Sequence, residues 1–325
     1  MKKTFHQIAQ GFIENATLSD FDCRTVLDWF GNSSLYFSTE QEKNLAIRAF
    51  IWLYQHIAPD DGVPLDPIAR SKCIAAFSEE FSLSGSAAER LFADYVCNAN
   101  VTKPVIVGIE GLDGSGKTVQ AKKLGEALRQ NGKKVCVIDF PQYASFFGRE
   151  IGVLLSDKSI ISAMQLDEKS MCLWYALDRW KAVKDAQIGE YDYVIFNRYT
   201  LSSVVYQSAR RYRGLNREFA DWIFELEHKQ LMLPVPDIYI YLDAGLEFCG
   251  ENVLRKDERV YVDGLDVYEK SQDLLSCCRG IYKRLSDEID GIIVLKCIDT
   301  EGRLRGMEEI GSEIIAVLTE YGLYI

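Results

Sequence analysis

The chain has 325 residues, of which 48% are hydrophobic and 26% charged, and its formal net charge is −11. This composition is ordinary for a globular protein with room for two domains, and the acidic balance excludes broad nucleic-acid binding, which requires a basic surface. The nine cysteines and three histidines form no C-x-x-C pair and no close histidine cluster, which argues against a zinc site and favours free thiols in a reducing compartment.

Residues 1–100 carry hydrophobic side chains at the spacing of amphipathic helices. Residues 38–41 (Ser-Thr-Glu-Gln) form a capping box before one apolar run, and Asp66 followed by Pro67 matches the start of another helix. We therefore predict a small all-helical domain over residues 1–100, built from about five short helices. Its role is not evident from sequence, because five short acidic helices could cap the following domain, make an oligomer interface or recruit a protein. We favour a docking or regulatory module over a second enzyme, since the predicted helices carry no carboxylate–histidine set.

Polar residues soon after Met1 interrupt the apolar core that a signal peptide needs. No run approaches the ~20 apolar residues of a membrane span. We therefore expect a cytoplasmic protein that has neither a membrane nor a nucleic acid as its partner.

From Pro104 onward the pattern changes to short apolar runs that alternate with helical stretches. This alternation predicts an α/β domain over residues 104–325, with a parallel sheet covered by helices on both faces. Ligands in such sheets bind at the carboxyl ends of the strands. The expected strands are residues 105–109, 134–139, 192–196, 237–242 and 292–297.

Residues 111–118 read Gly-Leu-Asp-Gly-Ser-Gly-Lys-Thr, a complete phosphate-binding loop between a predicted strand and a predicted helix that ends near residues 131–132. Its glycines permit backbone torsions that let successive N–H groups point at one anion. Lys117 adds a charge for the β- and γ-phosphates, and the Thr118 hydroxyl can ligate Mg²⁺. We assign the whole loop to nucleotide binding: Gly111, Leu112, Asp113, Gly114, Ser115, Gly116, Lys117 and Thr118.

Further segments follow the loop in a fixed order. They are Phe-Pro-Gln-Tyr at 140–143, Ala-Leu-Asp-Arg at 176–179, Arg-Tyr-Thr-Leu-Ser-Ser-Val-Val-Tyr-Gln at 198–207, Tyr-Leu-Asp at 241–243 and Asp-Val-Tyr-Glu at 266–269. With this loop and these segments, residues 104–325 resemble the thymidylate kinase (dTMP kinase) family. Residues 1–100 do not take part in the resemblance.

The resemblance implies a P-loop nucleoside-monophosphate-kinase-like fold, in which a parallel sheet is flanked by helices, here preceded by the small all-α domain. It also implies a transferase of nucleotide biosynthesis that moves the γ-phosphate of ATP to dTMP, giving dTDP, with Mg²⁺ as cofactor. A homodimer, and a protein partner for the N-terminal helices, are both left open.

The acceptor is an anion that must approach an anionic γ-phosphate, so fixed cations have to offset the repulsion. Arg198, at a strand end, can offer its planar fork to the acceptor phosphate. By resemblance, Tyr175 stacks on the pyrimidine, Arg179 hydrogen-bonds its edge, and Tyr206 crowds the ribose 2′ position. The full set that the resemblance assigns to substrate binding is Phe140, Tyr143, Tyr175, Arg179, Arg198, Ser203, Tyr206, Gln207 and Asp266.

The resemblance also indicates the metal and the remaining catalytic groups. The expected metal-binding set is Thr118, Asp113 and Glu269. Some family members carry an arginine inside the phosphate loop, at the position that is Gly114 here, and others carry it in a lid. Gly114 therefore points to the lid type, and the expected catalytic set is Lys117, Arg198, Asp113, Arg255 and Arg259.

Two positions depart from the family pattern. Most members have aspartate where this chain has Asn197, and a carboxylate at that strand end usually organises Mg²⁺ or its water shell. The change either lowers catalytic efficiency or moves the metal duty to Asp113 and Glu269. Gln142 replaces a frequent arginine and removes one cation from the acceptor side.

Two other functions compete with dTMP phosphorylation. One is a kinase for another deoxynucleoside monophosphate, because base choice can turn on one hydrogen bond. The other is a catalytically weakened nucleotide-binding regulatory protein. The sequence contains no N-K-x-D or T-K-x-D motif and no L-S-G-G-Q motif, which disfavours a GTPase switch and a transporter-type ATPase.

Overall fold

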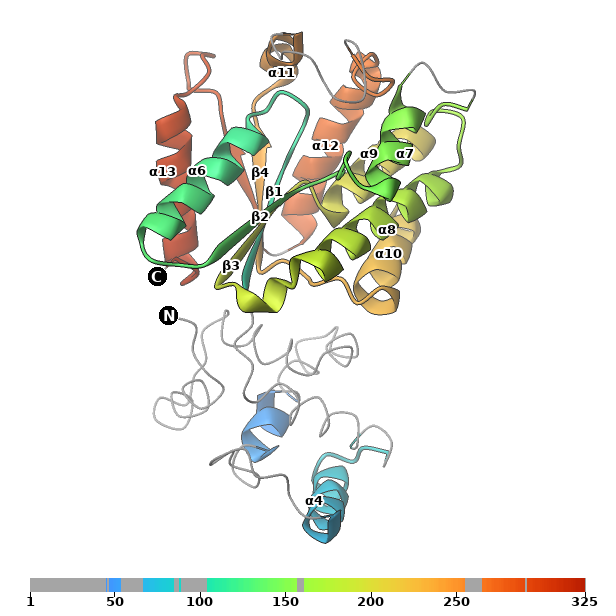
Figure 1. The fold of residues 1–325 in the computed structure, drawn as a ribbon, viewed down its shortest axis with the longest axis vertical. Coiled ribbons are helices and arrows are strands. Elements are labelled where there is room, and N and C mark those ends of the chain that lie inside the picture. Colours follow the sequence, from blue (N-terminus) through green and yellow to red (C-terminus); the bar gives the residue numbers. More distant parts are fainter. Residues whose placement is uncertain are drawn as a thin grey trace. The chain divides into compact units, whose positions relative to one another are not determined.

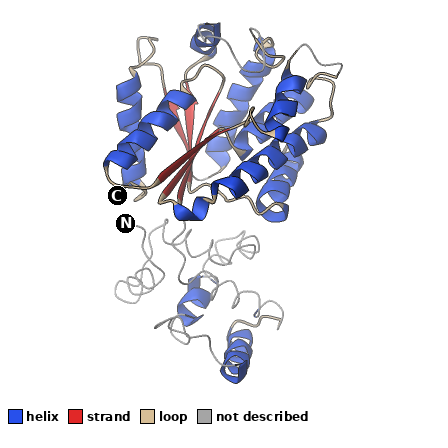
Figure 2. Cartoon of the chain, in the orientation of Figure 1, coloured by secondary structure: helices blue, strands red, loops and turns tan. Residues whose placement is uncertain are grey.

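The computed structural model describes residues 45, 47–53, 67–84, 88, 104–156, 161–254, 265–289 and 291–324. The chain divides into two compact units, residues 1–103 and 104–320, apart from the last few residues. Figures 1 and 2 show the helices and strands of both units, and each unit is described by itself.

The described part of the first unit is helical, as the sequence predicts. Helix α4 (Pro67–Glu80) begins at the predicted proline, and residues 47–53 form part of another helix. Aromatic side chains hold the two together, because the ring of Trp52 lies 5.4 Å from that of Phe77 and Phe77 is fully buried. The other helices predicted for residues 1–100 lie outside the described residues.

The second unit is built on a parallel sheet of five strands in the order β2-β3-β1-β4-β5. The five predicted strands are confirmed, each within about two residues at either end. Their bounds are β1 (Val105–Gly111), β2 (Val135–Asp139), β3 (Tyr193–Asn197), β4 (Ile238–Asp243) and β5 (Ile292–Lys296).

Helices cover both faces of this sheet (Figure 1). One face carries α6 (Lys117–Gln130) and α13 (Met307–Glu320). The other face carries α9 (Thr200–Tyr212) and α12 (Gln272–Glu288), with three helices packed outside α9 or against one another. Those three are α7 (Phe146–Leu155), α8 (Glu168–Ala186) and α10 (Arg217–Phe224).

Three short elements complete the second unit. Helix α11 (Leu246–Leu254) follows β4, a 3₁₀ turn spans Ile188–Glu190, and a π-helical turn at Glu225–Gln230 continues α10. Among the described residues, no helix has the length and apolarity needed to cross a lipid bilayer.

The three inner strands explain why this sequence forms a parallel sheet. All residues of β1, β3 and β4 are buried, which fits their nearly continuous apolar sequence and the helices on both sides. Gly108 on β1 lies beside Tyr239 on β4, and a Cβ at Gly108 would come within 2.4 Å of that ring. The glycine therefore makes room for an aromatic side chain in the middle of the sheet.

The register of the strands brings their polar ends together. Asn197, the last residue of β3, pairs with Ile109 of β1 on one side and with Asp139, the last residue of β2, on the other. Because the strands are parallel, all of these residues lie at one edge of the sheet, next to the loop that joins β1 to α6.

Replacement of Ile195 by alanine tests the central role of β3. Ile195 is fully buried between β2 and β1, so Ile195→Ala should lower the free energy of unfolding by about 3 kcal/mol through lost contacts and a residual cavity. Denaturant titration followed by circular dichroism measures the change. Val153→Ala on α7 is the control, because 46% of that side chain is exposed and its loss should leave stability nearly unchanged.

Candidate functional site

A cavity of about 620 Å³ opens at the carboxyl edge of the sheet. Its walls come from the phosphate loop, the ends of β2 and β3, and helices α8, α9 and α11. Thirteen residues that the sequence assigns to the site line this cavity: Asp113, Gly114, Gly116, Lys117, Thr118, Phe140, Tyr143, Tyr175, Arg179, Arg198, Ser203, Tyr206 and Asp266. The topology thus gathers segments that lie far apart in the sequence.

The phosphate loop presents a helix start that is open to an anion. Gly116 precedes α6 with a φ of 91°, offers no side chain to cap the helix, and the first turn holds no acidic residue. The N–H groups of the first turn and the positive end of the helix dipole therefore lie beside the cavity. The buried Lys117 ammonium donates to the carbonyl of Leu112 at 2.6 Å, which keeps the charge inside the loop.

Gly114 is fixed by its contact with α11. Its φ is 82°, and a Cβ at this position would lie 2.2 Å from the carbonyl oxygen of Cys249. The Asn252 amide also donates to the Gly114 carbonyl at 2.9 Å. A side chain at position 114 is therefore excluded on two grounds, backbone torsion and space, which gives a physical reason for the absence of an arginine in this loop.

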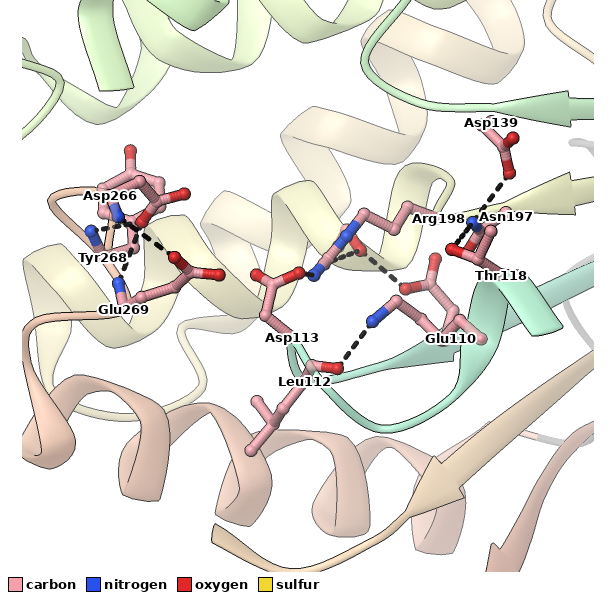
Figure 3. A network of polar contacts seen from close by, with 12 residues as sticks. Glu110, Leu112, Asp113, Thr118, Asp139, Asn197, Arg198, Asp266, Tyr268 and Glu269 are labelled. Atoms are coloured by element: carbon pink, nitrogen blue, oxygen red, sulfur yellow. Dashed lines mark hydrogen bonds and ion pairs between the residues drawn. The ribbon is translucent and has the colours of Figure 1, made fainter. Parts of the chain in front are cut away.

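Arg198 joins the end of β3 to the phosphate loop. Its guanidinium forms an ion pair with Asp113 at 2.5 Å and lies 5.4 Å from the ring centre of Tyr206 (Figure 3). Burial alone would lower the pKa of Arg198, but the interactions with Asp113, Tyr206 and Tyr282 together outweigh burial and raise that pKa well above its usual value. A fixed positive charge thus faces the cavity directly beside the donor loop.

Glu110 supports this arrangement, and sequence reasoning missed it. This fully buried carboxylate accepts hydrogen bonds from the backbone N–H of Tyr199 at 2.7 Å, the hydroxyl of Ser202 at 2.6 Å and the hydroxyl of Tyr282 at 2.8 Å. Arg198 itself has a φ of 64°, which is unfavourable for a residue with a side chain. Glu110 holds in place the residues that directly follow Arg198 in the chain.

Arg179 lies in the cavity wall, and other side chains hold its guanidinium in place through hydrogen bonds. It donates to both carboxylate oxygens of Glu227, at 2.9 and 2.7 Å, and also to the Ser203 hydroxyl. The guanidinium lies 5.8 Å from the ring centre of Tyr175, one helical turn away on α8. Arg179, Ser203 and Tyr175 are therefore brought together as expected, whereas the partner Glu227 was not predicted.

Gln207 lies behind the wall and does not line the cavity. Its amide nitrogen donates to the hydroxyl of Tyr268 at 3.1 Å, and its amide oxygen accepts from Arg210 at 2.9 Å. It is fully buried. The assignment of Gln207 to substrate binding stays a prediction, and its contacts here position Tyr268, which does reach the cavity.

Asp266 and Glu269 form one turn at the rim of the site. The Asp266 carboxylate accepts from the N–H groups of Tyr268 and Glu269, both at 2.9 Å, and the Glu269 carboxylate accepts from the N–H of Asp266 at 3.0 Å. Burial, the nearby charge of Glu269 and that of Asp113 raise the pKa of Asp266 to about 7. Figure 3 shows Asp113 between this turn and Arg198.

The predicted turn at 140–143 forms the wall beside β2. The Phe140 ring packs on Phe196 at 5.8 Å and on Tyr199 at 6.0 Å, and the peptide bond to Pro141 is cis. The Gln142 amide donates to the carbonyl of Asp139 at 2.6 Å and does not line the cavity. Gln142 thus braces the turn.

The residues at the strand ends suit a magnesium ion held with a nucleotide. Mg²⁺ keeps most of its waters and takes one or two protein ligands beside the phosphates, so a full protein cage is not needed. Among the described residues no group of three or more histidine, cysteine, aspartate or glutamate side chains could hold a metal alone. Thr118 and Asp139 line the cavity, and the Asn197 amide nitrogen lies 2.9 Å and 2.7 Å from their oxygens.

Several predicted residues stand apart from the cavity lining. The side chains of Arg255 and Arg259 lie outside the described residues, so the cationic lid stays a prediction. Glu269 and three loop residues, Gly111, Leu112 and Ser115, support the site from behind its lining. Sequence reasoning did not select Asp139, Ser202, Asn252, Leu304 or Met307, which line the cavity.

Comparisons with known proteins agree with this geometry. The family model described as thymidylate kinase matches residues 109–303. The thymidylate kinase of Mycobacterium tuberculosis is 30% identical over 186 residues, which cover 56% of this chain and 86% of that protein. A probable thymidylate kinase of Pyrococcus abyssi is 29% identical over 215 residues, which cover 65% of this chain and 94% of that protein. The structure of the thymidylate kinase from Candida albicans matches the fold with a TM-score of 0.51 at 21% identity, over 68% of this chain and 93% of that one.

Glu227→Gln tests whether the buried pair holds Arg179 in place. Removal of the charge leaves a buried guanidinium without its counter-ion, so the free energy of unfolding should fall by about 3 kcal/mol or more. Thermal and denaturant unfolding measure the loss. Asp185→Asn is the control, because the Lys181–Asp185 pair is exposed and should contribute little. Equal stability of both variants would contradict the assigned role of Glu227.

Proposed function

The chain belongs to the thymidylate kinase family, and we propose that it transfers the γ-phosphate of ATP to the 5′-phosphate of dTMP, giving ADP and dTDP. The observation that supports this best is the ion pair between Arg198 and Asp113, at 2.5 Å. It places the cation expected for the acceptor phosphate beside the loop expected for the donor. Two mutually repelling phosphate groups would therefore meet between fixed positive groups.

The donor end of the cavity is suited to a triphosphate. The open start of α6 and the Lys117 ammonium would bind the β- and γ-phosphates, with Lys117 exchanging the Leu112 carbonyl for phosphate oxygens. Val119, Leu304 and Met307 line the same cavity as exposed apolar side chains and would offer contact area to the nucleoside. ATP as the donor is part of the proposal.

The acceptor end is suited to a pyrimidine deoxynucleotide. Tyr175 would stack on the base, and the Arg179–Ser203 pair presents polar atoms at its edge. The buried ring of Tyr206 narrows the cavity where the sugar would lie and would disfavour a 2′-hydroxyl. Asp266 lies at the rim of that region, next to the Arg198–Asp113 pair.

The transfer step needs positioning and charge neutralisation more than covalent help from the protein. In the proposed step, an oxygen of the acceptor phosphate attacks the γ-phosphorus, and the bond to the β–γ bridging oxygen breaks as ADP leaves. Lys117 and Arg198, which both line the cavity, would neutralise the charge on the transferred group. When bound, Mg²⁺ would shield the phosphate charges, and the Thr118 hydroxyl would help to hold it.

One feature favours a second candidate, a nucleotide-binding regulatory protein with weakened catalysis. Asn197 lies where most family members have aspartate, and it lines the cavity. Nucleotide binding without turnover, on any deoxynucleoside monophosphate, would select this alternative. Turnover with a different deoxynucleoside monophosphate would keep the chemistry and change the acceptor. The predicted cytoplasmic location, a homodimer and a partner for the N-terminal helices all stay proposals.

Lys117→Ala tests the phosphate loop. Loss of the ammonium removes a charge that acts on the transferred phosphate, so kcat with ATP, Mg²⁺ and dTMP should fall about 100-fold or more. ADP release measures turnover. Lys122→Ala on the same helix is the control, because Lys122 is exposed, does not line the cavity and should leave kcat unchanged. Equal activity of the two variants would remove the loop from the mechanism.

Tyr175→Ala tests the acceptor pocket. A lost stacking contact typically weakens binding by about 1–3 kcal/mol, so KM for dTMP should rise about tenfold or more while KM for ATP stays unchanged. Steady-state kinetics with each substrate varied in turn separates the two values. Tyr212→Ala on α9 should change neither, because this tyrosine is 40% exposed and does not line the cavity. A larger effect on ATP would place the base elsewhere.

A further inference from the structure

We propose that Asp139 supplies the carboxylate that organises the metal of the bound nucleotide, in place of the carboxylate that position 197 lacks. The proposal rests on the proposed function, since it concerns a metal held with ATP. Sequence reasoning left two alternatives open, a lower catalytic efficiency or metal binding by Asp113 and Glu269. The contacts at the sheet edge favour a residue that it did not consider.

The geometry places Asp139 and Asn197 as a facing pair. They are the last residues of β2 and β3, they are register partners, and the Asn197 amide donates to the Asp139 carboxylate at 2.7 Å. The same amide nitrogen donates to the Thr118 hydroxyl at 2.9 Å. One amide thus ties together the hydroxyl expected on the metal and the nearest strand-end carboxylate (Figure 3).

The chemistry of the pair explains why asparagine fits at position 197. Two carboxylates at this spacing would repel each other, and one of them would tend to stay protonated. An amide instead donates to Asp139 and keeps its carboxylate charged and oriented. The negative charge that most family members place at the end of β3 is therefore found at the end of β2, at the next strand of the same sheet edge.

The surroundings of Asn197 also point to a ligand. Asn197 is 6% exposed and lines the cavity, and its amide oxygen has no hydrogen-bond partner among the described residues. A buried acceptor without a partner is costly unless water or a ligand satisfies it. A hydrated cation between Thr118 and Asp139 would bring water donors to this oxygen.

The other candidate carboxylates are held by protein groups. Asp113 pairs with the Arg198 guanidinium, and Glu269 accepts the backbone N–H of Asp266. Asp139 is exposed to the cavity at the strand end, and its side chain is oriented by an amide rather than neutralised by a cation. It is therefore the carboxylate best placed to accept from the waters of a metal beside Thr118.

The test measures how strongly Mg²⁺ enhances nucleotide binding, without any turnover. The Kd of β,γ-imido-ATP is measured by calorimetry in Mg²⁺ and in EDTA. The Kd in EDTA divided by the Kd in Mg²⁺ then gives the factor by which the metal strengthens binding. For Asp139→Asn this ratio should fall about tenfold or more, as for other groups that orient metal-bound waters. The affinity in EDTA should be unchanged or higher, because a repulsive charge has been removed.

Two further variants complete the design. Asp139→Asn combined with Asn197→Asp moves the carboxylate back to β3 and should restore much of the lost ratio. Asp287→Asn makes the same substitution on an exposed residue in the last turn of α12, just before β5 and so at the opposite edge of the sheet, and should leave both affinities unchanged.

Each result has a definite consequence. A ratio for Asp139→Asn equal to that of the wild-type chain would overturn the proposal, and so would equal losses of affinity in Mg²⁺ and EDTA, which would indicate a structural role. In either case wild-type binding would still show the metal dependence that the proposed function requires. A wild-type chain that binds no analogue under either condition would instead remove the proposed function, and this inference with it.

Discussion

The site depends on one ion pair, between Arg198 at the end of β3 and Asp113 in the phosphate loop. It joins two segments that are far apart in sequence and holds a positive charge in a largely buried position before any substrate arrives. In the proposed phosphoryl transfer such a charge would have little reorganisation left to undergo, which is the condition under which electrostatic stabilisation is most effective. The left-handed backbone of Arg198 and the three hydrogen bonds accepted by Glu110 serve to keep that charge in place.

Around this pair, each wall of the cavity uses a different kind of physical support. The wall proposed for the donor consists of backbone N–H groups and a helix start, whose orientation is fixed by the fold. The wall proposed for the acceptor consists of long side chains, and Arg179 needs Glu227 to stay oriented in the interior. At the strand ends, Asn197 orients Asp139 through a neutral amide. Rigid elements therefore form the end of the cavity proposed for the donor, whereas buried polar networks shape the end proposed for the acceptor.

Local sequence predicted the parts of this architecture that depend on local interactions. The five strands, the phosphate loop and the helix start at Pro67 follow from apolar runs, glycine spacing and an N-cap, and the structure confirms them. Glu110, Glu227 and Asp139 escaped prediction because their partners lie 89, 48 and 58 residues away and are chosen by the fold. Gln207 is assigned to substrate binding by resemblance, and the sequence does not reveal that its amide contacts Tyr268 and Arg210 behind the cavity wall.

The close approach of Gly114 to the Cys249 carbonyl has a consequence for how such enzymes diverge. An ancestor with this packing could not gain a loop arginine by one mutation, since α11 would first have to withdraw and give up the hydrogen bond from Asn252. Each intermediate along that route would lose binding before it gained a new charge. A loop arginine and this packing of α11 on Gly114 are thus mutually exclusive, and a change at position 114 depends on earlier changes in α11.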